Sequence, residues 1–151
     1  MSFETITTDA LSFQPQNIVD VYLCGWCFHE LKAAAFSEPD IWQSSFKNIF
    51  DKMIKSFPKN NQGNPQGIIV ILETLGTSET PTRTGSHYYQ FLKEYGFTQS
   101  CIQTDYRFSD KEIAKKLVRF FFGESTVSLL KEKSDGIYLS EWTAVFQLHF
   151  S

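Results

Sequence analysis

Two almost continuous apolar runs stand out along the chain, at residues 18–24 and 68–72. A run of this kind is typical of a strand that is covered on both faces, as in a parallel sheet. Between the two runs, apolar residues recur every three or four positions over residues 42–57, which predicts an amphipathic helix with a wide buried stripe. A capping hydroxyl at Ser37 precedes this helix and Pro58 ends it.

The second half of the chain continues the alternation of helices and strands. A capping serine and a terminal glycine bracket a short helix over residues 86–96, and a strand is expected over residues 97–105. Ser109 begins a capping box that opens a helix through residue 122, followed by one or two helical turns. Residues 136–150 alternate between apolar and polar side chains, which favours one antiparallel or edge strand.

A further short strand is expected at residues 3–7, before the first apolar run. The whole order predicts an α/β fold with a mostly parallel sheet, an antiparallel C-terminal strand and helices on both faces. The length of 151 residues, without a linker or an internal repeat, indicates a single domain over residues 1–151.

Composition narrows the possible environments and partners. Charged residues make up 21% of the chain and the net charge is −3, which gives no electrostatic reason to expect nucleic acid. No apolar run approaches the roughly 20 residues of a membrane span, so no membrane association is expected. The first residues do not resemble a signal peptide, and three cysteines are an odd number, so we expect reduced thiols and a cytoplasmic location.

Several motifs resemble the C-terminal half of a class I S-adenosylmethionine-dependent methyltransferase. They are residues 8–10 (TDA), 19–26 (VDVYLCGW), 69–77 (IVILETLGT) and 95–97 (YGF). Three later segments are similar to a bacterial subgroup of unassigned substrate: 104–108 (TDYRF), 119–123 (RFFFG) and 137–146 (IYLSEWTAVF). That subgroup tends to have proline where Ser140 stands and glycine where Ala144 stands. The resemblance covers nearly the whole chain and implies part of a Rossmann-like methyltransferase sheet with S-adenosylmethionine as the cofactor.

The resemblance also implies cofactor-binding residues. Asp9 matches the acid that binds the adenine amino group, and the amide of Ala10 would lie against the adenine ring. Cys24 and Gly25 match the end of the fourth strand, whose backbone faces the sulfonium. From the residue type alone, an aspartate at this point is more often a turn former.

The substrate side of the site is expected at the ends of two strands and in one turn. Glu73 is the candidate catalytic residue, acting as a general base or clamping a substrate amine. Trp26, Thr74 and Tyr106 are candidate substrate-binding residues. The alternatives remain open: Trp26 as a core anchor, Glu73 as a carboxylate satisfied by loop amides, and Tyr106 as a surface residue.

The sequence contains no glycine-rich nucleotide turn before the strand at 18–24. Methyl transfer is therefore expected only in a truncated or split form, with a separate chain supplying that half. The strand at 18–24 would lie at an open sheet edge, which favours self-association as a homodimer or pairing with that separate chain.

Two functions of other classes stay open from the sequence. The chain could be a catalytically inactive methyltransferase fold that serves as a binding or assembly module. It could also be a small redox protein that uses the CxxC pair Cys24 and Cys27. A zinc site made of these two with His29 and Cys101 has poor spacing, so no metal is expected.

Overall fold

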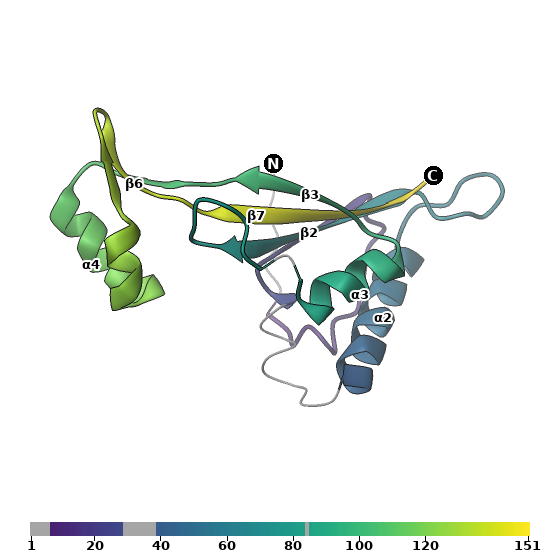
Figure 1. Ribbon diagram of the computed structural model, residues 1–151. Helices are drawn as coiled ribbons and strands as arrows, with labels where there is room; N and C mark the ends of the chain where they lie inside the picture. The colour runs from purple at the N-terminus through teal and green to yellow at the C-terminus, as the bar shows by residue number, and fades with distance from the viewer. Residues whose placement is uncertain (1–6, 29–38, 84) are drawn as a thin grey trace. The chain divides into compact units, whose positions relative to one another are not determined.

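The computed structural model describes residues 7–28, 39–83 and 85–151, which form a mixed α/β structure (Figure 1). The chain divides into two compact units, residues 1–70 with 147–151 and residues 71–146. The strand expected at residues 3–7 lies almost wholly outside the described residues. Within the described parts of the chain, no helix is both long and apolar enough to cross a membrane.

The first unit is built on the predicted amphipathic helix, α2 (Pro39–Lys55). Its apolar stripe is confirmed as core. The buried members are Trp42, Phe46, Ile49, Phe50 and Met53. Phe28 packs on this stripe, with its ring centroid 5.1 Å from that of Phe46. Beyond the helix end, Phe57 fills the space over Gly67, where a Cβ atom would stand 2.4 Å from the ring.

Strand β1 (Val21–Gly25) is covered on one face only within the described residues, contrary to the expectation from its apolar run. The Tyr22 side chain faces the end of α2, and its hydroxyl lies 2.6 Å from the Ser56 hydroxyl. Val21 and Leu23 point to the opposite face and are exposed. One row of side chains of this strand packs on the first unit. The other row, which is also apolar, has no described element against it.

The main sheet has the strand order β1-β2-β7-β3. Its other strands are β2 (Gly67–Gly76), β3 (Thr98–Gln103) and β7 (Trp142–Phe150). The expectation of a mostly parallel sheet is wrong, because β7 lies between β2 and β3 and runs opposite to both (Figure 1). The last strand, β7, is antiparallel to its neighbours, as its alternating sequence predicts. Because β7 lies between two other strands, the sheet is mixed.

The second unit contains α3 (His87–Tyr95), whose predicted ends are confirmed. The Ser86 side chain accepts a hydrogen bond from the Tyr89 amide, and Gly96 adopts a left-handed conformation with φ of 117°. Tyr89 packs on Phe146 of β7, with ring centroids 5.3 Å apart. Close to the start of the same strand, the Trp142 indole donates to the carbonyl of Glu79 at 3.2 Å.

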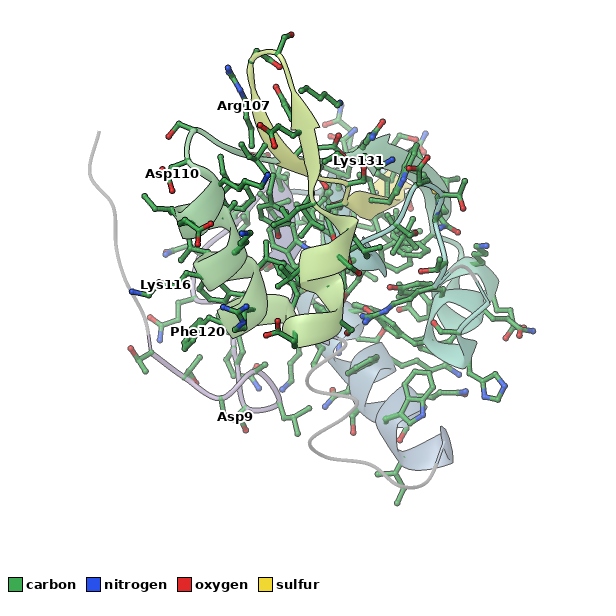
Figure 2. All side chains as sticks on the ribbon, turned by 60° about the vertical axis from the view of Figure 1, so that its left-hand side comes forward. Asp9, Arg107, Asp110, Lys116, Phe120 and Lys131 are labelled. Carbon is green, nitrogen blue, oxygen red and sulfur yellow. The ribbon has the colours of Figure 1, made fainter. Side chains whose placement is uncertain are left out.

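The single strand expected over residues 136–150 is two strands in different sheets. β6 (Gly136–Leu139) pairs antiparallel with β4 (Tyr106–Phe108) and β5 (Lys131–Lys133), and β7 begins after a break at Ser140 and Glu141. Gly136 permits the tight hairpin, because its φ is +156° and a Cβ there would stand 2.9 Å from the Phe108 carbonyl. Figure 2 shows Arg107 and Lys131 on this small sheet.

Two helical segments complete the second unit, α4 (Lys111–Phe122) and the 3₁₀ helix η1 (Glu124–Leu129). The residue that caps α4 is Asp110, whose carboxylate accepts from the Ile113 amide at 2.8 Å, and not Ser109 as the capping box predicts. An aspartate one position later competes successfully because its charge also favours the positive end of the helix.

Candidate functional site

Glu73 lies in a row of buried side chains on β2. Alternate residues of this strand face the core, so Ile71, Glu73 and Leu75 share one face, and Glu73 is only 1% exposed. The Tyr88 hydroxyl, from the first turn of α3, donates to Glu73 Oε1 at 3.1 Å. Glu73 therefore lies inside the strand, and a tyrosine hydroxyl is among its partners rather than only the loop amides considered from the sequence.

Thr74, the next residue, connects β2 to Glu141. The Thr74 hydroxyl donates to Glu141 Oε1, and the Thr74 hydroxyl oxygen accepts from the Gly76 amide at 3.1 Å. The Thr74 carbonyl accepts from the Tyr89 hydroxyl at 2.7 Å. Strand β2 and the first turn of α3 thus hold Thr74 from two directions and fix the geometry of its bond to Glu141.

Glu141 is the most unusual polar residue of the second unit. It is 6% exposed, and its Oε2 atom has no hydrogen-bond partner among the described residues. Its backbone is held on both sides, because its amide donates to Asp105 at 3.2 Å and its carbonyl accepts from the Thr104 amide at 2.8 Å. A buried carboxyl oxygen without a protein partner is costly, which makes Glu141 a candidate for the functional site.

The electrostatics of this cluster favour protonated forms. Burial raises the pKa of Glu141, while the hydrogen bond from Thr74 and the charge of Arg83 act in the opposite direction. Burial also raises the pKa of Tyr89 to about 12, and the negative charge of Glu73 adds to this effect. A carboxyl group with a raised pKa keeps its proton to a higher pH than an exposed glutamate does.

A small cavity adjoins the cluster along the chain. Its volume is about 150 Å³. Its walls include Thr77 and Ser78, directly after β2, and Ser140, directly before Glu141. Two more wall residues, Lys131 and Glu79, form an ion pair with each other. The cavity therefore has hydroxyl groups and a balanced pair of charges in its lining.

The structure brings together only part of the predicted substrate side. Glu73 and Thr74 are neighbours on β2 with separate hydrogen-bond partners, Tyr88 for Glu73 and Glu141 for Thr74. Tyr106 is close enough for the charge of Glu141 to raise its pKa, although burial is the larger cause. Glu141 and the two tyrosines of α3 were not predicted. The only signal for Glu141 in the sequence was the change of phase in the apolar alternation at this position, inside the strand that was predicted as continuous.

The predicted cofactor residues lie in the first unit. Asp9 is exposed and its carboxylate accepts from the Leu11 amide at 3.2 Å, as expected for a turn former. Ala10 belongs to the same turn. Gly25, which follows Cys24 in β1, has open space where a Cβ atom would stand. Trp26 is exposed and has a positive φ of 50°, so it is not a core anchor.

The cysteines give no support to a metal or redox centre. Cys24 is half-buried, and Cys27 and Cys101 are exposed. His29 lies outside the described residues. Within the described ranges, no group of three or more His, Cys, Asp or Glu side chains is placed to hold a metal ion.

Comparison with known proteins finds likeness among solved structures only. No protein-family model matches the sequence, and no curated protein matches it either. Among solved structures, the chain is similar to a putative methyltransferase from Bacillus halodurans, with a TM-score of 0.43 and 12% sequence identity. The match covers 93% of this chain and 68% of the other. A likeness this loose assigns no activity.

Proposed function

We propose that this chain forms the acceptor-binding side of an S-adenosylmethionine-dependent methyltransferase. The observation that carries the proposal is the buried Glu141 carboxyl, with one oxygen bonded to Thr74 and the other without a described partner. Thr74 is followed by only Leu75 and Gly76 in β2, so Thr74 and its partner Glu141 lie at the carboxyl end of that strand. Ligands of open α/β sheets bind outside such strand ends.

The free oxygen of Glu141 suits an acceptor that carries an exchangeable proton. When a nitrogen, oxygen or sulfur acceptor takes a methyl group, its proton has to leave, and we assign Oε2 the role of receiving it. Thr74 holds the other carboxyl oxygen, so the base does not need to reorient during the reaction. Glu73, the catalytic residue predicted from the sequence, is next to Thr74 on β2, and its carboxylate accepts from Tyr88.

The order of the strands agrees with the fold that the sequence resembles. In that fold the last strand is antiparallel to the rest of the sheet, as β7 is here between β2 and β3. This agreement concerns the fold alone, because the same fold can carry unrelated functions. The acceptor site must therefore be tested by chemistry.

We propose that a second polypeptide supplies the glycine-rich turn for S-adenosylmethionine. In the fold that the sequence resembles, the strand matching β1 lies beside the strand that carries this turn. β1 is the terminal strand of the sheet order, with Val21 and Leu23 exposed. Asp9, Ala10, Cys24 and Gly25 would complete the cofactor site from this chain, and the open space beside Gly25 admits a ligand near its backbone.

The experiment is methyl transfer with the chain and the protein that copurifies with a tagged copy of it. S-adenosylmethionine with a radioactive methyl group and a small-molecule extract of the source cells serve as donor and acceptor pool. We expect label transfer only when both proteins are present. Glu141→Gln is expected to lower the rate by about 100-fold or more, the usual contribution of a positioned base.

One control and one further variant make this result specific. Glu94→Gln changes an exposed acid of α3 and is expected to leave the rate unchanged. Glu73→Gln is expected to keep the protein folded and lower the rate. Equal rates for wild type and Glu141→Gln, or transfer to no compound in any fraction, would contradict the proposal.

A further inference from the structure

Helix α4 carries an apolar face that no described element covers. Its buried face is narrow, with Ala114 and Val118 packed inward. The exposed face consists of Ile113, Leu117, Phe120 and Phe121. Figure 2 shows Lys116 and Phe120 on the outer side of this helix. Phe120 is 79% exposed and Phe121 is 68% exposed. Two large aromatic side chains exposed side by side form an apolar patch, which is more informative than a single exposed apolar residue.

These four residues have the spacing that helix packing uses. Ile113, Leu117 and Phe121 form one row at intervals of four, and such rows fit into the grooves of a facing helix. Phe120 and Phe121 already contact each other edge to face, with ring centroids 4.9 Å apart. The face is therefore a preformed ridge with a rigid aromatic pair at one end.

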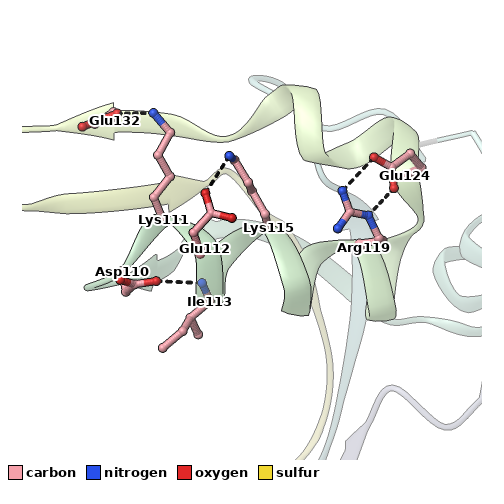
Figure 3. A network of polar contacts seen from close by, with 8 residues as sticks. All are labelled: Asp110, Lys111, Glu112, Ile113, Lys115, Arg119, Glu124 and Glu132. Atoms are coloured by element: carbon pink, nitrogen blue, oxygen red, sulfur yellow. Dashed lines mark hydrogen bonds and ion pairs between the residues drawn. The ribbon is translucent and has the colours of Figure 1, made fainter.

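The charges around α4 exclude one class of partner. Three of its cations are paired with acids: Lys111 with Glu132, Lys115 with Glu112, and Arg119 with Glu124 (Figure 3). With Asp110 and Lys116 included, these side chains, counting Glu132 of β5, are four acids and four bases, and the whole chain carries a net charge of −3. An anionic lipid surface would gain no net attraction from this segment.

The same charges suit a second copy of this chain. The acids Asp110 and Glu112 lie at the beginning of α4, and Lys116 and Arg119 lie toward its end. Two α4 helices packed antiparallel place the acidic start of each beside the basic end of the other. This arrangement also places the positive end of each helix dipole beside the negative end of the other, which is favourable.

The exposed apolar area is sufficient for a dimer. A large aromatic side chain presents roughly 150–250 Å². Two mostly exposed phenylalanines with Ile113 and Leu117 therefore offer on the order of 500 Å² on each copy, within the size of patches that mark interaction sites. A pair of such faces buries about 1,000 Å² in total, which is the lower limit for a specific interface.

We infer that two copies of this chain associate through α4, with the helices antiparallel and Leu117 near the two-fold axis. The surface is distinct from β1, which the proposed function assigns to a different polypeptide. The inference does not depend on methyl transfer, because it needs only the face formed by Ile113, Leu117, Phe120 and Phe121.

Sedimentation equilibrium over the micromolar range is the first test. We expect a monomer–dimer equilibrium in the wild-type chain. The double substitution Phe120→Ser and Phe121→Ser should raise the dissociation constant by at least about tenfold, as loss of buried aromatics does at interfaces. Leu23→Ser, an equally apolar and exposed position on β1, is the matched control and should leave the equilibrium unchanged. Circular dichroism establishes that each variant remains folded.

Cross-linking tests the orientation. In a background with Cys27→Ser and Cys101→Ser, a short bismaleimide should join Leu117→Cys to itself, because residue 117 meets its own copy at the axis. Ile113→Cys should react poorly, because in an antiparallel pair it faces residue 121. A wild-type monomer at all concentrations, dimerisation lost only in Leu23→Ser, or binding of the monomer to phosphatidylserine vesicles through the phenylalanines would overturn the inference.

Discussion

Glu141 is a carboxyl group that solvent scarcely reaches, bonded through one oxygen to a threonine 67 positions earlier in the chain. Its position depends on three separate parts of the second unit: Thr74 in β2, the segment at Thr104 and Asp105, and the start of β7. No local pattern in the sequence combines these parts. The residue scale is therefore where the structure adds most to what the chain itself indicates.

The raised pKa of Glu141 predicts how its substitution alters stability with pH. The folded-state pKa lies above the unfolded value of about 4.3, so the folded protein binds the proton more tightly. The contribution of this group to the free energy of unfolding is fully present below about pH 4 and is lost as pH rises through the folded-state pKa. Glu141→Gln removes this loss. We expect the variant to gain stability relative to wild type as pH rises.

Urea unfolding at a series of pH values measures this difference. Glu94→Gln, at an exposed position, serves as the comparison and should show a smaller dependence on pH. A difference between wild type and Glu141→Gln that stays constant from acid to neutral pH would show that the folded protein does not shift the proton affinity of Glu141.

Element boundaries show how local signals compete. Helix α4 has two candidate caps in succession, Ser109 and Asp110, and the structure uses Asp110. Asp110→Ala should therefore lower the free energy of unfolding by about 1 kcal/mol, whereas Ser109→Ala should change it by less than about 0.5 kcal/mol. Denaturant titration of both variants decides between the two caps. Equal losses would indicate that both side chains contribute to the first turn.

The elements were largely predictable because their signals are local. Periodicity predicted α2 and its buried stripe, and capping residues predicted α3. The sheet order was not predictable in the same way, since the alternation in β7 indicates an antiparallel strand without indicating its neighbours. The break at Ser140 and Glu141 was missed, although the apolar positions change there from odd numbers (Ile137) to even numbers (Trp142). Glu73 and Thr74 were found by resemblance, but their partners on α3 depend on tertiary packing.

At the scale of the whole molecule, the affinity for S-adenosylmethionine tests the proposal that a second polypeptide contributes to the cofactor site. The sequence contains no glycine-rich turn, whose backbone amides usually hold the phosphate or carboxylate end of a nucleotide cofactor. We expect the chain alone to bind S-adenosylmethionine with a dissociation constant above ~10 μM. Isothermal titration calorimetry on the purified chain measures this, and tight binding would remove the need for a second polypeptide.

The three tryptophans lie in three different environments, and this gives the protein its own set of optical probes. Trp42 is buried in the first unit, Trp26 is exposed on the same unit, and Trp142 is half-buried in the second. Emission from Trp42 and Trp142 should shift to longer wavelength as each surrounding core opens to water, while Trp26 should change little. Variants that keep a single tryptophan would therefore report on one unit at a time. If both report the same denaturation curve, the two units unfold as one cooperative body.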